Sequence, residues 1–149
     1  MNATARAFEG GISEWVATFA QLWAGGQSNV EKFMELFSPD VRLIAPGLRP
    51  TKGREAGLAA FRRTFHVLPD LTAEVLRWSA TGDVLFIEMT FKATIGGRIT
   101  EWRNVDRFLF RNGLAVERVA FYNPGKIRRA FLSSPSGWMQ LLRRLKGGW

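Results

Sequence analysis

The fold is decided by residues 84–110, VLFIEMTFKATIGGRITEWRNVDRFLF, which alternate apolar and polar residues on both sides of a two-glycine turn. Gly96-Gly97 is a typical two-residue connection of a β-hairpin. That turn places Lys92 directly opposite Glu101. Opposite charges across two antiparallel strands are favourable, so the predicted register is self-consistent.

This register gives the hairpin one polar face and one apolar face. The polar face carries Glu88, Thr90, Lys92, Glu101, Arg103 and Arg107, and the apolar face carries Ile87, Met89, Phe91, Ala93, Trp102, Phe108 and Phe110. Asn104 and Asp106 are the two polar exceptions on the apolar face. A carboxylate there is costly unless it is paired or hydrogen-bonded. Asp106 is therefore either a structural residue satisfied by a nearby donor or the acid of a pocket, and we favour the pocket acid.

The partner of Asp106 depends on the next turn, for which the residues allow two registers. A three-residue loop with a left-handed Gly113 predicts the pairs Asp106–Arg118, Asn104–Ala120 and Trp102–Tyr122. A two-residue Asn112-Gly113 turn instead places Asp106 opposite Val119 and points Glu117 inward. Because an inward Glu117 is unfavourable, we favour the three-residue loop. Arg118 would then keep Asp106 ionised and make it a better base than acid.

Outside the hairpin, we expect helices in the first half of the chain and strands in the second. Apolar residues recur at helical spacing over 12–23, 30–37 and 54–66, and strand patterns cover 41–45, 72–79 and 114–123. The resulting order, ααβαββββ, places a helical group beside a mostly antiparallel sheet. The sequence therefore predicts an α+β fold.

The composition limits the chemistry that the chain can perform. Of 149 residues, 46% are hydrophobic, one is histidine and none is cysteine. These counts argue against disulfides, thiolate nucleophiles, His-based triads and zinc sites, so we expect neither a metal nor a cofactor. No targeting segment and no apolar run of about eighteen residues is seen, which makes the cytoplasm the expected location.

The formal charge of +8 is concentrated at the C-terminus. Residues 124–149 hold no acid and six cations, namely Lys126, Arg128, Arg129, Arg143, Arg144 and Lys146. We therefore divide the chain into a body, 1–123, and a basic tail, 124–149, and expect no nucleic-acid partner. Trp138, Leu141, Leu142 and Leu145 lie at helical spacing in the tail. We expect this amphipathic helix to pack on its own domain or on a dimer mate, with membrane contact as the less favoured alternative.

Several short segments together resemble a known family. They are Phe37–Val41, Gly53–Ala56, Pro69–Leu71, Asn104–Phe108 and the run from Asn112-Gly113 to Glu117-Arg118. In this order they resemble the nuclear transport factor 2-like superfamily, and within it the branch of SnoaL-like polyketide cyclases and ketosteroid isomerases, over about residues 10–123. The resemblance implies a cone-shaped sheet wrapped around three helices, a deep pocket lined by the apolar face, and a homodimer formed through the outer face.

The resemblance also implies roles for single residues. Asp106 matches the acid/base aspartate of the cyclases, with Arg118 tuning it and Asn104 and Tyr122 orienting the substrate. The expected pocket lining is Trp102, Phe19, Trp23, Met89, Phe91, Phe108 and Ala45. The chain departs from the isomerases at two of these positions, because Ala45 replaces their general base and Phe19 replaces their tyrosine.

The predicted function is that of a small-molecule pocket enzyme. Asp106 would move a proton on an apolar carbonyl compound, for isomerisation or for intramolecular aldol closure. The alternative is a non-catalytic module that binds a small hydrophobic ligand, since a fold alone does not assign chemistry. A role in protein interaction is the third possibility.

Overall fold

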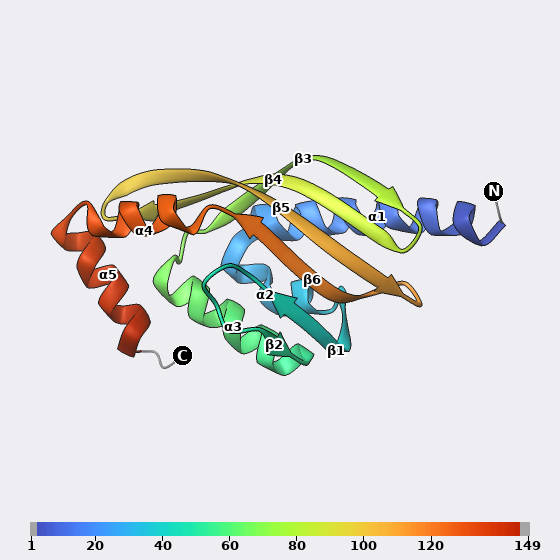
Figure 1. Ribbon diagram of the computed structural model, residues 1–149, viewed down its shortest axis with the longest axis horizontal. Coiled ribbons are helices and arrows are strands. Elements are labelled where there is room, and N and C mark those ends of the chain that lie inside the picture. Colours follow the sequence, from blue (N-terminus) through green and yellow to red (C-terminus); the bar gives the residue numbers. More distant parts are fainter. Residues whose placement is uncertain (1–2, 147–149) are drawn as a thin grey trace.

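The computed structural model describes residues 3–146 and has the expected α+β architecture (Figure 1). Its elements are α1 (Ala3–Gly25), the 3₁₀ turn η1 (Gly26–Asn29), α2 (Val30–Met34), β1 (Phe37–Ile44), β2 (Thr51–Lys52), α3 (Arg54–Val67), β3 (Thr72–Thr81), β4 (Val84–Ile95), β5 (Arg98–Arg111), β6 (Leu114–Tyr122), α4 (Pro124–Leu132) and α5 (Pro135–Lys146). Within this range, no helix is long and apolar enough to cross a membrane.

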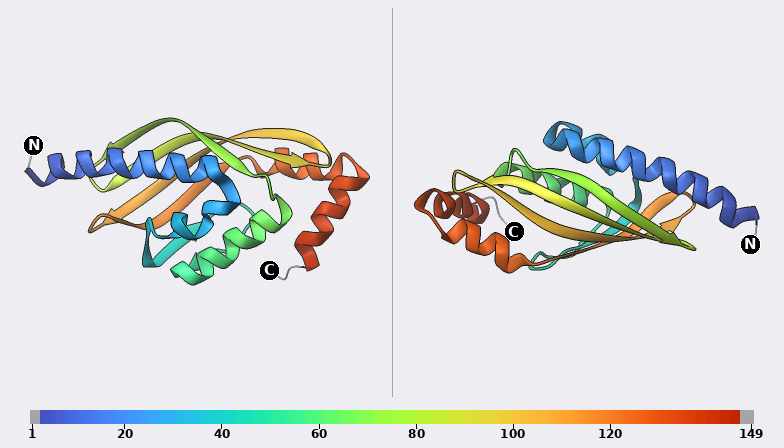
Figure 2. Two further views of the ribbon diagram at one scale, coloured as in Figure 1. Left: turned by 180° about the vertical axis from the view of Figure 1, so that it is seen from behind. Right: turned by 90° about the horizontal axis from the view of Figure 1, so that it is seen from above.

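One curved sheet of six strands forms the centre of the fold. The strand order is β2-β1-β6-β5-β4-β3, and every neighbouring pair is antiparallel except β1 and β6. Helices α1, α2 and α3 lie on the same side of the sheet (Figure 2). This arrangement confirms the expected sheet wrapped around three helices. The helices cover the sheet because the inward side chains of its strands need an apolar layer against them.

The central hairpin has the register expected from Gly96-Gly97. Both glycines have positive φ, 60° and 79° respectively. Positive φ at both central residues produces a turn whose twist matches that of the strands. Lys92 pairs with Glu101, and Ile87 pairs with Asp106, as the sequence predicts.

The hairpin of β5 and β6 has a register that differs from both registers predicted from the sequence. Asn112 and Gly113 form a two-residue turn, with φ values of 53° and 78°. A bulge follows, so that Phe110 pairs with Ala115 but Leu109 pairs with Glu117. Past the bulge the pairs are Asn104–Tyr122, Asp106–Ala120 and Phe108–Arg118. The favoured three-residue loop is wrong, and so are the Asp106 pairings expected from either turn.

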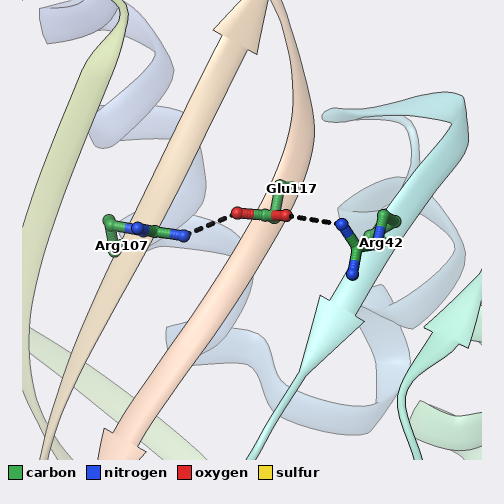
Figure 3. Close-up of polar contacts among 3 residues, drawn as sticks. All are labelled: Arg42, Arg107 and Glu117. Atoms are coloured by element: carbon green, nitrogen blue, oxygen red, sulfur yellow. Dashed lines mark hydrogen bonds and ion pairs between the residues drawn. The ribbon is translucent and has the colours of Figure 1, made fainter.

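The bulge nevertheless restores the alternation that the favoured register predicted. One extra residue on β6 reverses which face each following side chain occupies. Arg118 and Ala120 therefore lie buried on the inner face. Glu117 lies on the outer face, where it bridges Arg107 at 2.6 Å and Arg42 at 3.3 Å (Figure 3).

An aromatic core fills the space between α1 and the sheet. Trp15 stacks on Phe19 with a centroid separation of 5.3 Å and meets Phe108 edge-on at 5.0 Å. Phe33 and Phe37 join the same cluster from α2 and β1. Through Phe33 the cluster continues to Trp23 and Phe61.

The segment that follows β6 packs against the body at the tip of the central hairpin (Figure 1). It forms two helices, with the break before Pro135, and α5 contains the expected amphipathic pattern. Phe131 enters the core, and Leu141 packs against it. Trp138 and Leu142, expected on the packing stripe, are 57% and 54% exposed. The side chain of Leu145 lies outside the described residues, as do residues 1–2 and 147–149.

Gln140 fastens α5 to the body. Its Nε2 donates to the carbonyls of Val67 (2.8 Å) and Thr94 (3.0 Å), and its Oε1 accepts from the amide of Gly96 (3.0 Å). One side chain thus joins α5, the end of α3 and the tip of the hairpin. Loss of these bonds leaves backbone groups without partners.

We predict that Gln140→Ala lowers the free energy of unfolding by about 1–3 kcal/mol, the usual cost of buried polar groups left without partners. Urea unfolding measures the change, and hydrogen exchange of residues 135–146 should become faster. Met139→Ala, at a neighbouring position that is 63% exposed, is the control and should change neither quantity. Equal exchange in the two variants would contradict the anchoring role.

Candidate functional site

A cavity of about 470 Å³ adjoins the aromatic core, and Trp23 and Phe61, whose rings contact that of Phe33, form part of its wall. Its walls come from α3, the inner face of the sheet, the segment between β1 and β2, and helices α4 and α5. Phe91 and Trp102 form a flat wall, because their rings stack with centroids 5.6 Å apart and planes only 11° apart. Phe61 and Phe131 add further aromatic surface. A cavity of this size suits a small organic molecule.

A buried polar group lies where the inner face of the sheet meets the cavity. Asp106 is 0% exposed. Its Oδ1 accepts from Asn104 Nδ2 at 2.8 Å, and its Oδ2 accepts from Arg118 Nε at 2.7 Å. The carboxylate is thus hydrogen-bonded on both oxygens and charge-paired, which offsets the cost of burying it. Asn104 and Arg118 line the cavity, whereas Asp106 lies behind them.

Asp106 fixes the orientation of both residues in front of it. Because a carboxylate only accepts, it must receive the NH₂ side of the Asn104 amide. The Asn104 Oδ1 is left buried without a hydrogen-bond partner. Arg118 binds Asp106 through Nε alone, and its guanidinium carbon lies 5.4 Å from the centre of the Phe61 ring. The terminal nitrogens of Arg118 therefore remain able to meet a ligand.

Tyr122 adds a phenol to the cavity wall. Its hydroxyl donates to the carbonyl of Pro46 at 3.2 Å. Burial raises the pKa of this phenol, the charges of Arg118 and Arg144 oppose the rise, and the charge of Asp106 adds to it. The net pKa lies above the usual value for tyrosine, so the hydroxyl stays protonated at neutral pH. Tyr122 can orient a ligand as a donor but cannot accept a proton as a phenolate.

The cavity wall is cationic as well as apolar. Five cationic side chains line it, namely Arg49, Lys52, Arg63, Arg118 and Arg144. Among the residues that the structure describes, no aspartate or glutamate is part of the lining. Within residues 3–146, no group of three or more His, Cys, Asp or Glu side chains is placed to hold a metal ion.

Most side chains expected in the pocket do line the cavity. They are Trp23, Ala45, Phe91, Trp102, Asn104, Arg118 and Tyr122. Phe19, Met89 and Phe108 do not, since each is fully buried in the core. Alternation along a strand predicts an inward side chain, but it cannot tell a filled part of the cone from an empty one.

The sequence missed the contribution of the last two helices. Ile127, Phe131 and Arg144 all line the cavity. Helical spacing placed Arg144 on or beside the basic side of an amphipathic helix, away from the apolar stripe. Its contact with the cavity depends on the turn between α4 and α5, for which the sequence offers no signal beyond Pro135.

Comparison with known proteins identifies the family and the fold of this chain. The model of the SnoaL-like domain matches residues 13–118, which is more than half of the chain. The chain belongs to the SnoaL-like family. A comparison of this SnoaL-like chain with curated proteins finds no match.

Solved structures share the fold at low sequence identity. A candidate SnoaL-like polyketide cyclase from Jannaschia sp. CCS1 is 17% identical, with a TM-score of 0.73 over 84% of this chain and 93% of that one. IdmH, a candidate polyketide cyclase from Streptomyces antibioticus, is 23% identical, with a TM-score of 0.67 over 79% and 96%. A hypothetical protein with a ketosteroid isomerase-like fold from Catenulispora acidiphila, in complex with trimethylamine, is 18% identical, with a TM-score of 0.72 over 84% and 96%.

We predict that Asp106→Ala lowers the free energy of unfolding by about 3–5 kcal/mol, because Arg118 is then buried without its counter-charge. The double variant Asp106→Leu/Arg118→Met should cost less, since both charges leave together. Urea unfolding of both proteins measures the difference. Arg103→Ala, which breaks an exposed pair with Glu88, is the control and should cost about 1 kcal/mol or less. A double variant as unstable as the single one would contradict this account.

Tyr122 is the only tyrosine, so the absorbance of phenolate reports its ionisation alone. We predict a titration midpoint above that of free tyrosine, because burial disfavours the phenolate. Arg144→Gln should raise the midpoint further by removing a nearby positive charge, whereas Arg143→Gln, at an exposed position, should not. A midpoint at or below that of free tyrosine would contradict the prediction.

Proposed function

We propose that this SnoaL-like protein is an isomerase or cyclase that acts on an apolar carbonyl compound. The observation that carries the proposal is the buried Asn104–Asp106–Arg118 group at a cavity of about 470 Å³. Membership of the SnoaL-like family and the names of the solved neighbours support the same class of reaction. The cavity would bind the apolar part of the substrate against Phe91 and Trp102.

Arg118 would stabilise the charge that develops in the reaction. Removal of a proton from the carbon next to a carbonyl moves an electron pair onto the carbonyl oxygen and forms an enolate. Terminal nitrogens of Arg118 would donate to that oxygen, and the Tyr122 hydroxyl would add a second bond once it leaves the carbonyl of Pro46, its present acceptor. Donors held in place before the reaction, in a site that excludes water, lower the barrier because they need little reorganisation. Asp106 holds Arg118 in this position through Nε.

Asp106 would carry the proton. Its Oδ1 is bonded to Asn104, so the amide must turn away before this oxygen can meet the substrate. Asp106 then accepts the proton from carbon. In isomerisation it returns the proton to another carbon of the same molecule. In an intramolecular aldol closure, the enolate carbon forms a bond to a second carbonyl, and the proton goes to the alkoxide so formed.

A second candidate function is non-catalytic binding of a hydrophobic ligand. The observation that favours it is the placement of Asp106, which is fully buried and absent from the cavity wall. Within the described chain, neither another carboxylate nor the single histidine lines the cavity. In this version, Asn104 and Arg118 recognise the ligand and no bond changes.

The expected homodimer would form through the outer face of the sheet. Phe86 and Phe121 are exposed on this face, next to ion pairs that join neighbouring strands. Apolar side chains surrounded by paired charges are compatible with a modest interface.

The two functions can be separated with 2-tetralone, an apolar bicyclic ketone with acidic C–H bonds next to its carbonyl. We predict that the wild-type protein accelerates exchange of these protons in deuterium oxide, as followed by proton magnetic resonance. Asp106→Asn should slow the exchange by about 10²-fold or more, the usual contribution of a positioned acid/base group.

Glu101→Gln removes an exposed carboxylate from the outer face and is the matched control, which should exchange at the wild-type rate. If 2-tetralone binds but its exchange is not accelerated, the binding module is the better description. Full exchange activity in Asp106→Asn would exclude Asp106 as the proton carrier.

A further inference from the structure

Helix α5 presents an apolar side to solvent. Trp138, Met139 and Leu142 are 57%, 63% and 54% exposed. They share one side of the helix, because residues three and four positions apart are neighbours on a helix surface. The opposite side holds α5 to the body through Gln140 and Leu141. The three exposed side chains are therefore left largely uncovered by the rest of the described chain.

The end of α4 extends this apolar side and fixes its orientation. The Trp138 Nε1 donates to the carbonyl of Leu132 at 2.8 Å, and Leu132 is itself 48% exposed. A side chain at Gly137 would collide with the carbonyl of Phe131, so the glycine permits the close approach of the two helices where they meet (Figure 1). Leu132, Trp138, Met139 and Leu142 together form one surface, which we call the α5 face.

Cations accompany the α5 face, and no acid lies in this part of the sequence. Residues 124–149 contain six cations and neither aspartate nor glutamate. Arg143 and Lys146 are exposed on the same side of α5 as the apolar residues. Arg128 and Arg129 are exposed on α4. None of the ion pairs between described residues includes any of these four side chains, so their charge is available to an anionic partner.

We propose that the α5 face binds the surface of a membrane that contains anionic lipid. The apolar side chains would enter the interfacial region, and the cations would lie beside the lipid headgroups. Helices that bind at this depth carry tryptophan and leucine on one side, with arginine and lysine around them. The helix would lie in the plane of the surface, since its twelve residues are too few to cross a hydrocarbon core of about 30 Å.

Charge complementarity favours lipid over a second copy of this chain. In a twofold-symmetric dimer formed through the α5 face, the same surface of each copy would meet the other. Arg143 and Lys146 would then approach the same cations of the partner, and residues 124–149 contain no acid to balance them. A nucleic acid would match the cations but would offer little to the exposed apolar side chains. An anionic membrane accommodates both.

The helices that would bind the membrane also form part of the cavity wall. Ile127 and Phe131 line the cavity from α4. Binding through the α5 face would therefore hold the cavity beside a lipid phase, where apolar compounds concentrate because they leave water. The membrane proposal does not rest on the proposed function, since it uses only the outer side of these helices.

Co-flotation of the full chain with lipid vesicles tests the proposal. Vesicles of phosphatidylcholine with about one quarter phosphatidylserine should bind the protein, because each cation near an anionic surface adds to the affinity. Vesicles of phosphatidylcholine alone should bind at least about tenfold more weakly. Raising the salt to about 1 M should weaken binding to the anionic vesicles to a similar extent, since it screens exposed charges.

Two variants separate the apolar and the charged parts of the α5 face. Leu142→Gln should weaken binding to the anionic vesicles about fivefold or more, because it removes an apolar side chain from the bound face. The matched control is Leu76→Gln, the same substitution at a leucine of β3 that is 39% exposed, and it should bind as the wild-type protein does. All the substituted positions are exposed, and circular dichroism checks that each variant is folded.

Arg143→Gln/Lys146→Gln should weaken binding about tenfold or more, at about 1 kcal/mol for each cation near the surface. Lys32→Gln/Arg111→Gln changes the net charge equally at exposed positions of α2 and β5, and it should bind within about twofold of the wild-type protein.

Several results would overturn the proposal. One is the absence of binding to the anionic vesicles, and another is an equal loss in each variant and its control, since a general effect would then explain the binding. If light scattering shows that Leu142→Gln dissociates a dimer while vesicle binding is unchanged, the α5 face is an interface between copies. Tighter binding to duplex DNA than to the anionic vesicles would assign the face to nucleic acid instead.

Discussion

The structure depends on the need to neutralise one carboxylate on an apolar sheet face. Asp106 is fully buried, and Arg118 and Asn104 supply its only hydrogen bonds among the described residues. Arg118 can reach it because a bulge in the last hairpin turns the even-numbered residues of β6 inward. Without the bulge, β6 would present Glu117 to the core, and two buried carboxylates would share one face. The same irregularity thus satisfies the charge and brings a guanidinium to the cavity.

The cavity exists because aromatic side chains fill only part of the space between the helices and the sheet. In the filled part, rings from α1, α2 and the sheet pack against each other and leave no room for a ligand. Beside it, the wall of the cavity is completed by α4 and α5, which are attached through Gln140. Well-packed aromatic groups resist deformation, so the filled part can act as a rigid base for the cavity. The candidate site therefore lies next to the closely packed aromatic side chains, where α4 and α5 complete the wall of the cavity.

The chemistry of the site combines an apolar wall with cations. Stacked rings of Phe91 and Trp102 suit a flat hydrophobic molecule, and Arg118 suits an oxygen that becomes negative. The Asn104 Oδ1 is buried and has no hydrogen-bond partner. The cavity thus offers both an apolar surface and hydrogen-bond donors, as an apolar carbonyl compound requires.

The sequence by itself determined the central hairpin, its faces and the burial of Asn104 and Asp106, because a two-residue glycine turn and strict alternation are local properties. It also determined the α+β class, since the order of periodic segments follows from short-range patterns. Tertiary structure alone decided three things: the bulge that places Arg118, the exclusion of Phe19 and Phe108 from the cavity, and the approach of Arg144. Each depends on contacts between elements distant in the chain, where packing volume and the pairing of buried charge select among arrangements that are locally equivalent.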